Sequence, residues 1–116
     1  MDKTPKYIKM SDWPEVQEGW KPAWGDFVVE DGVVFTLSTT RVDKSKLIHL
    51  KRQDQLQEME VDFNIYSQIS RFDKWVHNDA FYQRKTMWES HEQLWLAFVM
   101  HELHGKVWDN EKEEWV

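Results

Sequence analysis

The chain has 116 residues, of which 41% are hydrophobic, and its formal net charge is −6 at pH 7. This length suits one domain, and the hydrophobic content excludes a disordered chain. Because Cys is absent, disulfide scaffolds, thiolate nucleophiles and Cys-ligated metal sites are excluded. The longest apolar run, residues 94–100, is far shorter than the roughly 20 residues of a membrane-spanning helix. No signal-peptide core follows Met1, so we expect a soluble cytoplasmic protein that does not contact membranes.

The first half of the chain predicts an arm followed by a small sheet. Residues 1–25 combine Pro and Gly breakers with three Trp, and we expect an irregular, Trp-rich arm packed on the core. Two runs of β-branched and aromatic residues flank Asp31-Gly32, a dipeptide that favours the type I′ turn of a β-hairpin. Residues 46–50 alternate weakly in hydrophobicity and predict a third strand.

The second half predicts two long helices and a short hairpin. Apolar stripes over residues 51–78 lie on opposite sides of one helix, which either passes between two packing partners or breaks near Asn64. Thr86 and Glu89 fit a capping box, and Gly105 suits the C-cap of a deeply buried helix ending near His104. Residues 106–116 predict a hairpin in which Trp108 faces Trp115. The whole pattern indicates a single α+β domain over residues 1–116.

The acidity of the chain is concentrated near its C-terminus. Residues 1–85 hold 13 bases and 14 acids, whereas residues 86–116 hold two bases and seven acids. Clustered surface acids steer a positively charged partner toward them. We therefore predict a protein-binding site for a basic surface at four acids, namely Asp109, Glu111, Glu113 and Glu114.

One basic segment, residues 41–52, supports an alternative function. Phosphate contacts dominate affinity for nucleic acids, and Lys and Arg side chains supply them. A nearby Trp could then stack on bases, and the eight Trp of the chain belong either to the core or to a binding surface. The alternative nucleic-acid-binding site comprises Arg41, Lys44, Lys46, Lys51 and Arg52.

No residue pattern in the chain favours catalysis. His101 and His104 lie three residues apart and could contact one metal ion, but the HExxH zinc signature is incomplete and a third ligand is missing. Two His residues near a helix C-terminus are also favoured simply by the helix dipole. We therefore expect a protein that is not an enzyme and that uses no cofactor and no metal.

The chain resembles a group of small uncharacterised proteins encoded by phages and prophages of Gram-positive bacteria. The most specific matching block is Arg52-Gln53-Asp54-Gln55-Leu56-Gln57-Glu58-Met59, although Lys51 replaces a proline that such proteins carry. The resemblance implies an accessory phage protein in the host cytoplasm, and implies no activity, cofactor or catalytic residue. Because the chain also lacks a catalytic pattern and combines localised acidity with many Trp, we expect a protein-binding module, such as a counter-defence inhibitor of a host protein. The other matching blocks are Trp20-Lys21-Pro22, Gly25-Asp26, residues 94–100, Gly105-Lys106-Val107-Trp108 and Trp115-Val116.

Overall fold

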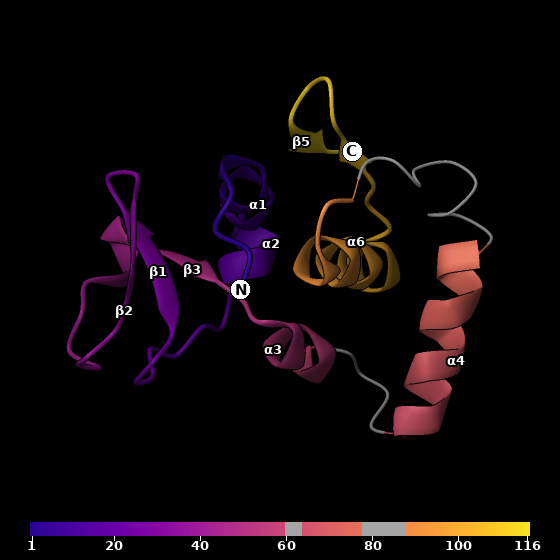
Figure 1. The fold of residues 1–116 in the computed structure, drawn as a ribbon, viewed down its shortest axis with the longest axis horizontal. Coiled ribbons are helices and arrows are strands. Elements are labelled where there is room, and N and C mark those ends of the chain that lie inside the picture. Colours follow the sequence, from indigo (N-terminus) through magenta and orange to yellow (C-terminus); the bar gives the residue numbers. More distant parts are fainter. Residues whose placement is uncertain (60–63, 78–87) are drawn as a thin grey trace. The chain divides into compact units, whose positions relative to one another are not determined.

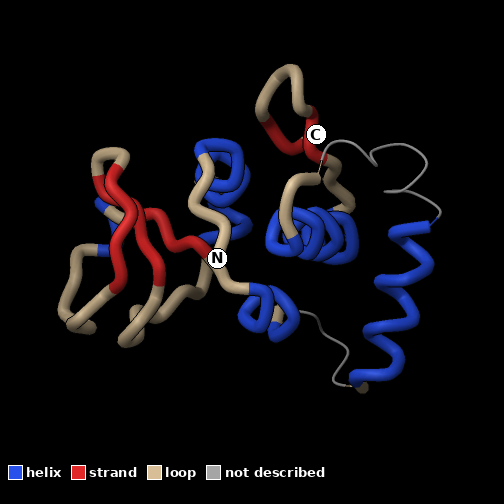
Figure 2. Tube along the Cα trace, viewed as in Figure 1, coloured by secondary structure: helices blue, strands red, loops and turns tan. Residues whose placement is uncertain are grey.

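A computed structural model describes residues 1–59, 64–77 and 88–116 (Figure 1). The chain falls into two units, Met1–Arg52 and Gln53–Val116. Helices and two small antiparallel sheets make it an α+β protein, as the sequence predicted (Figure 2). None of the helices in the described ranges combines the length and apolarity needed to cross a bilayer.

The first unit is built on a three-stranded sheet with the order β2-β1-β3. Strand β1 is Phe27–Glu30, β2 is Val33–Thr36 and β3 is Ile48–Leu50, so the third strand is confirmed. Asp31 and Gly32 have φ values of 50° and 78°, the left-handed pair that a type I′ turn requires. This turn pairs Glu30 with Val33 and thereby sets the register of the hairpin.

The N-terminal arm was expected to be irregular, but it includes two short helices. It contains α1, Pro5–Ser11, and α2, Pro14–Gln17. Pro was expected to break regular structure, yet Pro5 and Pro14 each stand at the start of a helix, where a missing N–H costs nothing. The Thr4 side chain caps α1 by accepting a hydrogen bond from the Tyr7 N–H at 3.3 Å. Helix α1 contacts β3 and buries Tyr7 and Met10 completely.

A small apolar core lies within the first unit. Trp20 of the arm, Val28 of β1 and Leu37 after β2 are buried together. The connection from β2 to β3, which includes the short 3-10 helix η1, Lys44–Lys46, adds two half-buried side chains, Val42 and Leu47. The arm and this connection therefore supply the apolar surface that a three-stranded sheet needs for stability.

In the second unit, the region predicted as one helix contains two. Helix α3 is Gln53–Glu58 and α4 is Ile65–Trp75. Asn64 is the N-cap of α4, because its side chain accepts hydrogen bonds from the N–H groups of Tyr66 and Ser67. The break near Asn64 was one of the two predicted alternatives. The two helices also differ in what they bury: Leu56 of α3 is buried, whereas Tyr66 of α4 is 82% exposed.

Helix α6, His91–His104, is the most buried helix of the described chain, but it starts later than predicted. Thr86 lies outside the described residues, and Glu89 precedes the helix. Ser90 is the N-cap instead: its hydroxyl accepts from the Gln93 N–H at 3.1 Å, and the Gln93 side chain accepts from the Glu89 N–H. Ser90 and Gln93 therefore cap the start of α6 in a way similar to a capping box, except that Gln93 bonds the N–H of the residue before the N-cap. The predicted end is confirmed, since Gly105 has φ 64°.

Aromatic rings connect α4 to α6. The ring of Phe72 stacks on Trp95 with centroids 4.0 Å apart, and it meets Phe98 edge to face at 5.2 Å. Trp75 is also buried and lies 5.6 Å from Phe98. The described second half thus contains α4 and α6, of 11 and 14 residues, and the shorter α3. The prediction of two long helices is therefore only roughly matched.

Candidate functional site

The predicted C-terminal hairpin is present and forms the candidate protein-binding site. Strand β4 is Trp108–Asp109 and β5 is Glu114–Trp115. Val107 and Val116 exchange both backbone hydrogen bonds, at 2.9 and 2.8 Å, so the next pair along is a non-hydrogen-bonded pair. Side chains come closest in such a pair, and the rings of Trp108 and Trp115 meet there edge to face, 5.2 Å apart. Both rings are buried, which fixes one face of the hairpin.

The opposite face of the hairpin carries acids. Asp109 lies directly across from Glu114, and side chains of neighbouring pairs point to opposite sides of a two-stranded sheet. Glu111 and Glu113 are exposed in the turn, together with Lys112. The hairpin therefore brings the four predicted acids onto one short element, which we call the acidic hairpin (residues 107–116).

Asp109 also has a structural role in the acidic hairpin. Its carboxylate accepts hydrogen bonds from the N–H groups of Glu111 and Lys112, at 2.9 and 3.0 Å, and so closes the turn. Glu113 has a φ of 55°, which is unusual for a residue with a side chain. Like charges directly across a strand pair destabilise it. The Trp pair on the other face offsets this cost.

The structure divides the predicted basic site into two parts. Arg41, Lys44 and Lys46 are exposed on the connection between β2 and β3. Lys51 is buried, and the guanidinium of Arg52 lies 3.8 Å from the Asp26 carboxylate. The first three cations are thus available to an external ligand, whereas the last two belong to an internal cluster.

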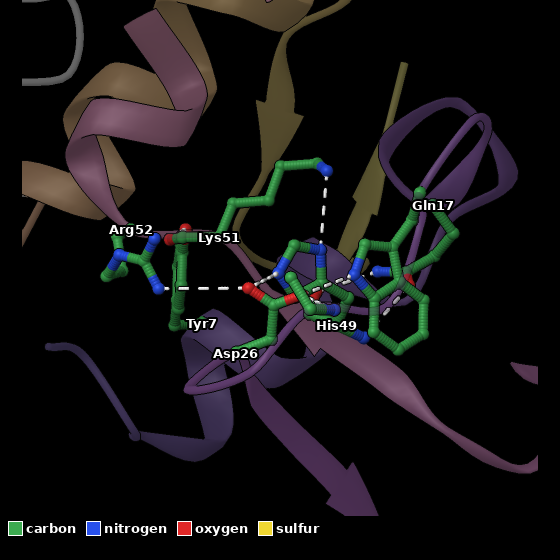
Figure 3. Close-up of polar contacts among 8 residues, drawn as sticks. Tyr7, Gln17, Asp26, His49, Lys51 and Arg52 are labelled. Carbon is green, nitrogen blue, oxygen red and sulfur yellow. Dashed lines mark hydrogen bonds and ion pairs between the residues drawn. The ribbon is translucent and has the colours of Figure 1, made fainter. Parts of the chain in front are cut away.

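That internal cluster is centred on Asp26, a buried acid at the start of β1 (Figure 3). Its Oδ2 accepts hydrogen bonds from the indole Nε1–H of Trp20, at 3.0 Å, and from the Ala23 N–H, at 2.9 Å. Its Oδ1 lies 3.7 Å from His49 Nε2. This carboxylate, at the start of the central strand β1, therefore contacts both the arm and the edge strand β3.

His49 and Lys51 complete the internal cluster from the same side of β3 (Figure 3). The His49 ring stacks on Trp20, with centroids 4.7 Å apart and planes within 13°. Lys51 Nζ lies 3.4 Å from His49 Nδ1. Burial lowers the pKa of Lys51, and the nearby Asp26 carboxylate opposes that effect only in part. Asp26, His49 and Lys51 are all buried, and the contacts of Asp26 and His49 with Trp20 hold the arm on the sheet.

Two further hydrogen-bonded side chains attach the arm to β3. The Tyr7 hydroxyl donates to the Lys51 carbonyl at 2.6 Å. The Gln17 side chain accepts from the His49 N–H at 2.9 Å and donates to the His49 carbonyl at 3.0 Å (Figure 3). The same amide also donates to the Ser11 carbonyl at 2.7 Å. Sequence reasoning missed this cluster because its members are separated by up to 44 residues and match no motif.

The Trp residues divide between core and surface. Trp20 of the arm is buried and Trp13 is half-buried. Trp24 is 75% exposed on a turn closed by an Asp26 N–H to Ala23 carbonyl bond of 3.1 Å, with Gly25 at φ 80°. Trp24 is thus the most exposed of the described Trp side chains.

No metal cluster of three His, Asp or Glu side chains occurs in the described ranges. His101 is half-buried, with its ring 6.2 Å from that of Trp75, and His104 is exposed near the end of α6. Comparison of the chain with protein-family models, curated proteins and solved structures finds no match. Any functional conclusion therefore depends on the residues themselves.

Proposed function

We propose that this protein binds a basic surface of another protein through its acidic hairpin. One observation carries the proposal: Asp109 and Glu114 lie opposite each other on a ribbon whose other face is fixed by the Trp108–Trp115 pair. This register places two carboxylates directly opposite each other on the face away from the Trp pair, and their combined negative charge would attract a basic surface. Glu111 and Glu113 extend the negative charge to the exposed turn.

The chemistry of the partner follows from this charge pattern. A Lys- or Arg-rich surface would offset the repulsion between Asp109 and Glu114, and long-range attraction would speed the encounter. Given the resemblance to phage proteins, we infer that the partner is a host protein and that covering its basic surface inhibits it. The function would then be that of a non-enzymatic, cytoplasmic phage accessory protein, such as a counter-defence inhibitor.

The experiment is an affinity purification from host lysate with charge-matched variants. The double variant Glu111→Gln/Glu113→Gln neutralises two exposed acids of the turn and leaves the Asp109 hydrogen bonds intact. The control, Asp12→Asn/Glu18→Gln, removes the same charge from two exposed residues of the first unit. We expect one host protein to be retained by the wild type and the control, lost with the hairpin variant, and released as salt rises. Equal retention by both variants would refute the acidic hairpin as the site.

The alternative, binding of nucleic acid, is supported by the exposure of Arg41, Lys44 and Lys46 and of Trp24 in the same unit. With three cations the log–log dependence of affinity on salt would have a slope of about −2.7 for double-stranded DNA. A gel shift with short single- and double-stranded probes at low salt measures it. Lys44→Ser/Lys46→Ser should abolish the shift and Lys21→Ser should not. No shift with wild-type protein would remove this alternative.

A further inference from the structure

The two edge strands of the three-stranded sheet differ in whether their outward backbone N–H and carbonyl groups have hydrogen-bond partners. On β3, the N–H and carbonyl of His49 point away from β1, because both bond to the Gln17 side chain. The primary amide of Gln17 thus takes the place that a neighbouring peptide group would occupy in a wider sheet. The β3 edge is therefore closed to strand addition at its central residue.

The β2 edge has no such cover among the described residues. The two-residue turn makes Glu30–Val33 a hydrogen-bonded pair, and the Leu37 N–H to Asp26 carbonyl bond of 2.9 Å continues the same alternation. The N–H and carbonyl groups of Val34 and Thr36 consequently point outward, away from β1. Neither residue bonds through them to any part of the chain that the structure describes.

The side chains of β2 also lack the features that normally protect an edge. The strand holds no charge and no Pro. Val33 and Phe35 point to the same face of the sheet and are 62% and 39% exposed. Open backbone groups beside exposed apolar side chains are the features that pair with another strand.

We propose that β2 pairs antiparallel with β2 of a second copy of this chain. Two outward residues per strand select the register: Val34 pairs with Thr36 of the second copy and Thr36 with its Val34, so Phe35 lies opposite itself on the two-fold axis. This register uses all the outward groups of both strands. A register centred on Val34 would instead oppose Thr36 to Gly32, which belongs to the turn.

Charge complementarity favours a second copy in this orientation. In the antiparallel register, position 31 of one chain lies opposite position 39 of the other, so the exposed Asp31 of one copy approaches the segment that contains the exposed Arg41 of the other. A parallel arrangement would instead place the two acidic turns, each with Glu30 and Asp31, side by side. The self-pairing is independent of the acidic hairpin, so either proposal can fail alone.

Cysteine cross-linking tests the register, since the native chain contains no Cys. Phe35→Cys places two thiols opposite each other in a non-hydrogen-bonded pair, where mild oxidation should form a disulfide-linked dimer. Val33→Cys is the matched control, because it lies on the same face and is more exposed. In the proposed register it lies opposite Leu37 of the second copy, four residues from the substituted position of that copy. We expect Phe35→Cys to cross-link at least tenfold faster. Equal or reversed rates would mean random collision and would overturn the proposal.

Sedimentation of the wild-type chain over a wide concentration range tests the pairing without a thiol. Thr36→Pro removes an outward N–H and leaves the ladder with β1 intact, whereas Thr36→Val keeps the N–H as the control. We expect the Pro variant to raise the dimer dissociation constant at least tenfold and the Val variant to leave it within about twofold, with unchanged circular dichroism. A wild type that stays monomeric throughout overturns self-pairing. If the wild type stays monomeric and Phe35→Lys abolishes its binding to a host protein, the β2 edge pairs with a strand of that host protein instead.

Discussion

Trp20 and His49 lie ring against ring, although one belongs to the N-terminal arm and the other to β3. The same Trp20 donates its indole N–H to Asp26, whose other oxygen faces His49. Three residues from three segments therefore fix one another, and the first unit depends on them for the position of its arm.

Removing the Asp26 carboxylate should destabilise the first unit. Asp26→Ala leaves the buried Trp20 N–H and the Ala23 N–H without their acceptor. We expect the free energy of unfolding to fall by about 2–4 kcal/mol, since each lost partner of a buried donor costs roughly 1–3 kcal/mol. Urea denaturation measures the change. The exposed control Asp12→Ala should shift it by no more than about 0.5 kcal/mol, and a comparable loss in both variants would contradict this role for Asp26.

Lys51 should make stability rise with pH in the alkaline range. Its pKa in the folded state is lowered from its ordinary value of 10.5, chiefly by burial. Below the folded-state pKa the amine is charged in both states and its burial is fully unfavourable. As pH rises through that pKa, the folded state loses its proton first, so folding becomes more favourable until the unfolded amine also titrates.

Lys51→Met should remove this dependence and raise stability near neutral pH. The measurement is urea unfolding at several pH values between neutrality and the unfolded pKa. Lys21→Met, at an exposed position, serves as the control for the titration of all other groups. If the free energy of unfolding changed with pH in the same way for the wild type and Lys51→Met, the burial of Lys51 would not be the cause of the pH dependence.

Ser45 should control the titration of Asp43 on the connection between β2 and β3. The Ser45 hydroxyl and N–H donate to the Asp43 carboxylate, at 2.6 and 3.1 Å, and these bonds lower the pKa of Asp43. Ser45→Ala removes the hydroxyl bond, so the pKa should rise toward 3.8. Carboxyl NMR during an acid titration measures it. An unchanged pKa would show that the hydroxyl bond is absent in solution, and Ser38→Ala is the control.

The Trp pair should determine whether the acidic hairpin forms. Trp115→Ala deletes one ring of the buried edge-to-face pair, and truncation of a buried Trp typically costs about 3–5 kcal/mol. We expect denaturation to show a free energy of unfolding that is lower by this amount. Binding of the partner should also be lost, even though all four acids remain. Trp24→Ala, at an exposed ring, should change stability little. Retained binding by Trp115→Ala would mean that the acids act without a folded ribbon.

Features governed by neighbouring residues could be predicted from the sequence. Asp31-Gly32 and Gly105 adopt left-handed conformations that few other residues favour, so both the hairpin turn and the end of α6 were predicted in the right place. The Trp108–Trp115 pair followed from their spacing about a short turn. In each case the physical cause lies within about ten residues of the effect.

Competing local signals and distant contacts explain the features that could not be predicted. Two sequence matches to a capping box occur within eight residues, at Thr86–Glu89 and Ser90–Gln93, and the sequence alone does not rank them. The Asp26–His49–Lys51 cluster arises from contacts across the first unit, and Lys51 was expected on the surface because it lies in the basic segment 41–52. Burial, rather than residue type, separates it from Lys44 and Lys46.

The Gln17 amide has a consequence for polymerisation. A sheet with one open edge joins a single further sheet, and growth then stops at a closed pair. Gln17→Ala would leave the outward N–H and carbonyl of His49 without their partners, although helix α1 and the Tyr7 hydroxyl would still cover part of the β3 edge. In an antiparallel self-pairing through β2, the Gln17 side chain would therefore help to limit the assembly to two sheets.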